Sequence, residues 1–118
     1  MAKFMKLEAK GKEYLIGFSN RAAALKAEKA GFYLAIQNID NYPLDSYETI
    51  LKAGLLDKQP TITNQEVKDI LEEISINNAN NDEAINYGDI SSFLVEQYTA
   101  FISAQGKKKV KKLEIVEI

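Results

Sequence analysis

The stretch Pro43–Ile74 constrains the fold most, because it predicts two amphipathic helices joined by a short turn. Thr63 and Glu66 have the T-x-x-E spacing of a capping box, in which the threonine hydroxyl caps the glutamate amide and the glutamate carboxylate reaches back to the threonine amide. Ile62 and Val67 flank this pair at the positions of a hydrophobic staple. The stretch therefore predicts a helix with a well-defined start and an apolar face that must pack against other elements.

The two helices of this stretch are expected over residues 45–56 and 64–74. Asp45 and Glu48 give the first helix a weaker version of the same cap, and Gly54 lies near its end. The glycine indicates either the close approach of another element or a simple weakening of the helix. The second helix has one apolar and one acidic face, and the acidic face lacks the alternating oxygen ligands of a calcium loop.

Upstream of this stretch, residues 3–18 predict a β-hairpin. Apolar and polar side chains alternate in two runs, and Lys10–Gly11 between them supplies the positive φ of a tight turn. An isolated hairpin is marginal in water, so one face must pack on the helices. Its free edge either remains unpaired or pairs with a neighbouring subunit or partner.

Two short helices are expected to follow the hairpin. The first covers residues 20–30, with Ser19 as its N-cap and Gly31 as the left-handed residue that ends it. The second covers residues 33–39 and carries an aromatic and aliphatic stripe. Arg21 is the only arginine of the chain, which raises a binding role, but a solvated side chain in the first helical turn is the simpler interpretation.

The last helix is expected over residues 89–105, with Asp89 as its cap. It follows residues 75–88, whose many asparagines predict a loop. Its broad aromatic stripe is suited to core packing or to a contact between subunits. Because aromatic side chains dominate interface hot spots, they are the candidates for partner binding. These candidates are Tyr47, Phe93, Tyr98 and Phe101.

A lysine-rich tail, residues 106–118, is predicted to be flexible and solvated. Residues 107–118 carry five lysines and two glutamates, whereas residues 1–106 carry 10 basic and 15 acidic side chains. Lysine clusters bind nucleic acid and anionic surfaces, but this one contains no arginine and no aromatic residue for base stacking. A small nucleic-acid-associated protein is therefore the alternative function, and nucleic acid is the less favoured partner.

The composition excludes several kinds of site. The chain of 118 residues contains no cysteine and no histidine, so it has no disulfide, no thiolate metal site and no imidazole base. We expect no catalytic residue, cofactor or metal, and no enzyme. No apolar run approaches the ~20 residues of a membrane span and no signal peptide is evident, which favours a cytoplasmic location without a membrane partner.

The predicted fold class is α+β, mainly α, in one globular domain over residues 1–105. An N-terminal β-hairpin is followed by about five helices and the basic C-terminal tail. Three segments within these elements are distinctive, namely GFYLAI at 31–36, NYPLDS at 41–46 and AGLLDKQPTITNQEV at 53–67. In these segments and in the order of its elements, the chain resembles, over roughly residues 3–105, the tail assembly chaperones of long-tailed bacteriophages and of prophages of Gram-positive bacteria.

The resemblance implies a non-enzymatic factor that binds the tape measure protein, keeps its long hydrophobic helices soluble and helps bring major tail protein to the growing tube. It also implies a homo-oligomer in the host bacterial cytoplasm that is absent from the finished virion. Many members of the family are made in two lengths by ribosomal frameshifting. A purine run encoding Gly106-Lys107-Lys108 would fit such a site.

Overall fold

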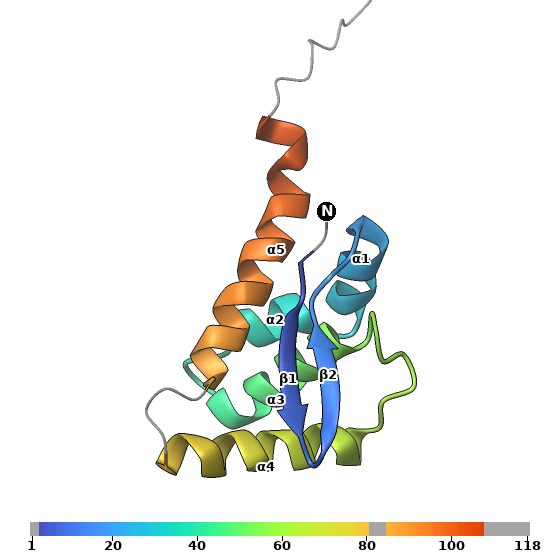
Figure 1. The fold of residues 1–118 in the computed structure, drawn as a ribbon. Coiled ribbons are helices and arrows are strands. Elements are labelled where there is room, and N and C mark those ends of the chain that lie inside the picture. The colour runs from blue at the N-terminus through green and yellow to red at the C-terminus, as the bar shows by residue number, and fades with distance from the viewer. Residues whose placement is uncertain (1–2, 81–84, 108–118) are drawn as a thin grey trace, which may run out of the picture.

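The computed structural model describes residues 3–80 and 85–107 (Figure 1). Within these ranges the chain forms one antiparallel β-hairpin followed by five helices, which confirms the predicted α+β, mainly helical class. The elements are β1 (Met5–Ala9), β2 (Lys12–Ile16), α1 (Arg21–Lys29), α2 (Phe32–Gln37), α3 (Pro43–Leu55), α4 (Asn64–Asn80) and α5 (Tyr87–Lys107). The structure places Gly106 and Lys107, the first two residues of the predicted lysine-rich tail, in α5, and residues 108–118 lie outside the described residues.

Helix α3 is the centre of the fold, because it contacts β2 and each of the other four described helices. Figure 1 shows α4 running across the turn end of the hairpin and α5 rising beside the sheet. The C-terminal turns of α5 extend past the other elements in this view. The arrangement buries one face of the hairpin and leaves the end of α5 as a projecting wall.

The hairpin has the predicted turn and the predicted buried face. Lys10 and Gly11 adopt positive φ values of 51° and 75°, and Leu7 pairs with Tyr14 across the strands. Side chains that alternate along both strands point into the core, as the period of two requires. The buried ones are Leu7, Ala9, Tyr14 and Ile16.

The outer edge of β2 is partly closed by a side-chain amide. Gln59 Oε1 accepts a hydrogen bond from Leu15 N at 2.9 Å, and Gln59 Nε2 donates to Leu15 O at 3.0 Å. The same Nε2 donates to Leu55 O at 2.6 Å, which fixes the amide to the end of α3. Gln59 therefore satisfies the backbone groups of Leu15 that a third strand would otherwise pair.

The start of α4 confirms the predicted capping box. Glu66 N donates to Thr63 Oγ1 at 3.1 Å, and Thr63 N donates to Glu66 Oε1 at 3.2 Å. Ile62 and Val67, the predicted staple residues, are both buried. Local sequence determines this helix start completely, because every group involved lies within six residues.

Three other helix starts correct the predicted caps. Helix α1 is capped by Asn20, whose side chain accepts a hydrogen bond from Ala23 N at 2.9 Å. The predicted cap, Ser19, instead donates its backbone N–H to Asp57 Oδ2 at 2.8 Å. Helix α3 begins at Pro43 after Tyr42, which makes no side-chain cap bond. The predicted Asp45–Glu48 cap is therefore wrong. Proline with its fixed φ suits the first helical position, and the Asp45 carboxylate lies in the first turn at the positive end of the helix dipole.

Helix α5 begins at Tyr87, two residues before the predicted cap. Asn86 Oδ1 accepts from Asp89 N at 2.9 Å, and Asp89 Oδ2 accepts from Asn86 N at 3.1 Å. Asn86 is thus the capping residue and Asp89 its reciprocal partner three residues later. The N-x-x-D spacing carries the same signal as the capping box of α4.

Helix α4 continues to Asn80, so the prediction that a loop begins at Ser75 is wrong. The Tyr87 hydroxyl donates to Leu71 O at 2.9 Å, and the Ser75 hydroxyl lies 2.5 Å from the same phenol oxygen. Asn80 Nδ2 also donates to Ile76 O at 3.1 Å. The asparagine-rich composition predicted a loop, but a tertiary contact from Tyr87 overrides that preference.

The close packing of α3, β2 and α5 explains Gly54. A methyl group placed on Gly54 would lie 2.7 Å from Leu94 Cδ1 and 2.9 Å from Ile16 Cγ2, both shorter than an ordinary carbon–carbon contact. The alternative of simple helix weakening is therefore unnecessary. Gly54 is required because α5 and β2 approach α3 at this residue.

Candidate functional site

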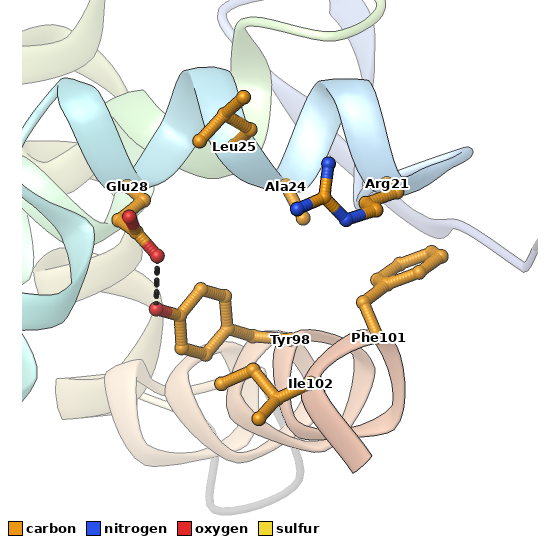
Figure 2. A pocket seen from close by; sticks show the side chains of 7 residues that line it. All are labelled: Arg21, Ala24, Leu25, Glu28, Tyr98, Phe101 and Ile102. Atoms are coloured by element: carbon orange, nitrogen blue, oxygen red, sulfur yellow. Dashed lines mark hydrogen bonds between the residues drawn. The ribbon is translucent and has the colours of Figure 1, made fainter. Parts of the chain in front are cut away.

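An open groove lies between α1 and the C-terminal half of α5, with a volume of about 260 Å³ (Figure 2). We call it the α1–α5 groove. Helix α1 contributes four of its lining residues, and α5 contributes three. They are Arg21, Ala24, Leu25 and Glu28 from α1, and Tyr98, Phe101 and Ile102 from α5.

Helical periodicity places these residues on facing stripes. The α1 residues occupy positions i, i+3, i+4 and i+7, and the α5 residues occupy i, i+3 and i+4. Ala24 on this stripe and Ala27 on the same helix are buried, and these small side chains allow α1 to lie close to its neighbours. The groove therefore forms where two helical faces meet without filling the space between them.

Tyr98 forms the floor of the α1–α5 groove. Only 9% of its surface is exposed, and its ring packs against Phe32 with a centroid distance of 5.2 Å. Its hydroxyl donates to Glu28 Oε1 at 2.6 Å. Burial, together with this bond to Glu28, raises the pKa of Tyr98 to about 12. The phenol therefore stays protonated at neutral pH and acts as a fixed link between the two helices.

The rim of the groove combines exposed apolar side chains with charges. Leu25 is 38% exposed and Ile102 is 58% exposed, values that are high for large aliphatic residues. Phe101 is half-buried beside them. Arg21 and Glu28 are exposed at opposite ends of the groove in Figure 2. Such a surface is suited to contact with another apolar surface and offers both signs of charge at its ends.

The structure brings together two of the four predicted partner-binding aromatics. Tyr98 and Phe101 both line the α1–α5 groove. Tyr47 lies elsewhere, on a second groove beside Tyr87, with the two ring centroids 5.0 Å apart. Phe93 is half-buried and packs against the core, and it lines neither groove. The aromatic stripe of α5 is therefore divided between core and surface.

The second groove lies between α3, α4 and the start of α5. Its volume is about 360 Å³, and Leu44 on its rim is 79% exposed. Charged side chains of both signs line it, namely Glu48, Lys68 and Glu72. The α1–α5 groove is the stronger candidate, because two predicted aromatics and two exposed aliphatic side chains meet there.

Reasoning from the sequence missed the α1 side of the groove. Arg21 was expected to be a solvated first-turn side chain, and it is exposed, but it also lines the groove. The spacing of Arg21, Ala24, Leu25 and Glu28 carries the signal, since these positions share one helical face. Their mixed chemistry hides it, because only one of the four is a large apolar residue.

Within residues 3–80 and 85–107, no three His, Cys, Asp or Glu side chains lie together in a way that would hold a metal ion. None of the helices in these described ranges has the length and apolar character needed to cross a membrane.

Comparison with known proteins adds no relative. No protein-family model matches the chain, and no curated protein or solved structure matches it.

Proposed function

We propose that this protein is a tail assembly chaperone of a long-tailed phage or prophage. It acts without catalysis in the host cytoplasm, binds the tape measure protein, keeps it soluble and helps recruit major tail protein. It forms homo-oligomers during assembly and is absent from the finished virion. The observation that carries this proposal is the α1–α5 groove, an open surface lined by Tyr98 and Phe101, with exposed apolar side chains on its rim and a charge at each end.

The chemistry of the groove supports a role in holding apolar helices. Burial of apolar surface contributes about 25 cal/mol per Å², from which the entropic cost of association is subtracted. Leu25 and Ile102 expose apolar surface that a client helix would cover. Because the floor hydroxyl of Tyr98 already bonds to Glu28, an apolar client that covers the floor leaves this hydroxyl with a partner.

Co-expression with the tape measure protein of the same genome tests the proposal. We expect the tape measure protein to stay in the soluble fraction with the wild-type chain and to aggregate without it. Ile102→Ser should reduce the soluble yield, whereas Ile76→Ser should not, because Ile76 is 53% exposed on α4 and lines neither groove. A tape measure protein that aggregates equally with and without the chain would refute the proposed function.

Gene order gives an independent test. We expect a tail tube gene upstream and a very long coiled-coil gene downstream. A slippery heptamer at the codons for Gly106-Lys107-Lys108, with an overlapping downstream frame, would show that a longer form is made. The frameshifting hypothesis fails if the gene contains neither feature.

A further inference from the structure

Two opposite charges mark the ends of the α1–α5 groove. Arg21 and Glu28 are seven residues apart on α1, which corresponds to about 10.5 Å along the helix axis at a rise of about 1.5 Å per residue. Figure 2 shows them at opposite ends of the groove, with the Phe101 ring beside Arg21. The groove is therefore electrically polar along its length.

Both charges remain available to a partner. The Arg21 side chain makes no hydrogen bond or ion pair with another residue in the described part of the chain. Glu28 accepts the Tyr98 hydroxyl on Oε1, and its Oε2 has no partner among the described residues. A basic side chain near Glu28 and an acidic side chain near Arg21 would complete two ion pairs at the rim.

The spacing of the charges favours a helix as the occupant. Residues seven apart on a client helix lie on one face and are also separated by about 10.5 Å. A β-strand rises about 3.3 Å per residue, so two of its residues lie a similar distance apart when they are three positions apart in sequence. Side chains three positions apart point to opposite faces of the strand, so both cannot face the groove. The groove is also smaller and more open than the cavities of about 300–1,000 Å³ that enclose small ligands.

We propose that the α1–α5 groove binds a single client helix that carries an acidic and a basic side chain seven residues apart, with apolar residues between them. The acidic side chain pairs with Arg21, the basic one pairs with Glu28, and the apolar residues cover Leu25, Phe101 and Ile102. The charges set the direction in which the helix lies. This inference rests on the proposed function, since it names the client feature that the chaperone recognises.

Three synthetic helical peptides test the inference. They share one leucine- and alanine-rich face and differ only at two positions seven residues apart, which hold Glu and Lys, Lys and Lys, or Glu and Glu. Binding to the full chain is measured by fluorescence anisotropy. We expect the mixed-charge peptide to bind about fivefold tighter than either like-charged peptide at low salt, and the preference to shrink as salt is added.

Substitutions on the exposed rim locate the binding to this groove. Arg21→Glu makes both ends acidic, so the preference should switch to the Lys and Lys peptide. Lys26→Glu is the matched control, because it makes the same charge change on an exposed α1 residue outside the groove lining. Ile102→Ser should weaken the binding of all three peptides about fivefold, whereas Ile76→Ser should leave their binding unchanged.

The outcomes separate the inference from the proposed function. Equal binding of the three peptides, no binding of any of them, or an unchanged ranking in Arg21→Glu overturns the inference, even if the tape measure protein is kept soluble. Self-association that Ile102→Ser abolishes, without peptide binding, assigns the groove to a second copy and also overturns it. The expected ranking without solubilisation of the tape measure protein supports the groove chemistry and refutes the chaperone function.

Discussion

Substitution of Gly54 by alanine should destabilise the fold, although alanine is the better helix former. The helical preference favours alanine by up to about 1 kcal/mol. Against this, the new methyl group would lie 2.7 Å and 3.0 Å from the two Leu94 methyls and 2.9 Å from Ile16 Cγ2. Overpacking of a well-filled core costs about 1–3 kcal/mol. We therefore expect a net loss of about 1 kcal/mol in the free energy of unfolding.

The packed surroundings of Gly54 decide whether the substitution raises or lowers the free energy of unfolding. Leu94 and Ile16 are fully buried, so neither can rotate its side chain into solvent to relieve the contact. Helix α5 or strand β2 must instead move away from α3. That movement also shifts the α5 wall of the α1–α5 groove, so Gly54→Ala should weaken peptide binding as well as stability.

Urea denaturation followed by circular dichroism measures the effect, and a double-mutant cycle with Leu94→Ala identifies its cause. Leu94→Ala alone should cost about 2–5 kcal/mol, because it leaves a cavity. In the Gly54→Ala background it should cost at least about 1 kcal/mol less, since the new methyl occupies part of that space. A Gly54→Ala protein as stable as the wild type, or strictly additive effects, would refute the packing argument.

Three further substitutions follow from the hydrogen bonds described above. Thr63→Ala should lower the free energy of unfolding by about 1 kcal/mol in urea denaturation, because it removes the cap of α4. An equal loss of stability in Thr61→Ala, which changes a nearby exposed threonine, would contradict this. Gln59→Ala should lower the free energy of unfolding by about 1–3 kcal/mol and accelerate hydrogen exchange at the Leu15 amide. Unchanged exchange at this amide would show that the outer edge of β2 does not depend on Gln59. The raised pKa of Tyr98 stabilises the fold below pH 10, and this contribution is lost between pH 10 and about 12. The difference in stability between the wild type and Tyr98→Phe should therefore shrink over that range. A constant difference in thermal unfolding would argue against this.

Local signals predicted the elements that depend on residues close in sequence. The hairpin turn at Lys10–Gly11 and the α4 capping box of Thr63 and Glu66 each involve residues within a few positions of one another, and the structure contains both. The order of hairpin and helices followed from the same kind of pattern. Such features are readable because a short peptide already holds all the groups that take part.

Contacts between residues that are distant in sequence could not be predicted from local patterns. Helix α4 extends to Asn80 although its composition predicts a loop, and the Tyr87 phenol that bonds to Leu71 O and meets Ser75 comes from the next helix. The choice between core and surface for the aromatics of α5 depends on where α1 packs. Tyr98 and Phe101 face α1 across the groove, and no pattern within α5 indicates that neighbour.

Gln97 on α5 ties this helix to the N-terminal segment of the described fold. Its Nε2 donates to Lys3 O at 2.7 Å and its Oε1 accepts from Phe18 N at 2.8 Å, across 94 and 79 residues of sequence. Because the ribosome releases the chain from its N-terminus, these two bonds can form only after Gln97 has been synthesised. We therefore expect α5 to dock after the hairpin has formed.

This order has a kinetic signature. Closure over such a separation is slow compared with formation of the hairpin or of single helices. In native-state hydrogen exchange, the Phe18 amide should exchange together with the central amides of α5 as one cooperative unit. Exchange of Phe18 in step with the rest of the hairpin would contradict this order. The α5 side of the α1–α5 groove is therefore complete only after residues 98–102 have been synthesised and α5 has docked.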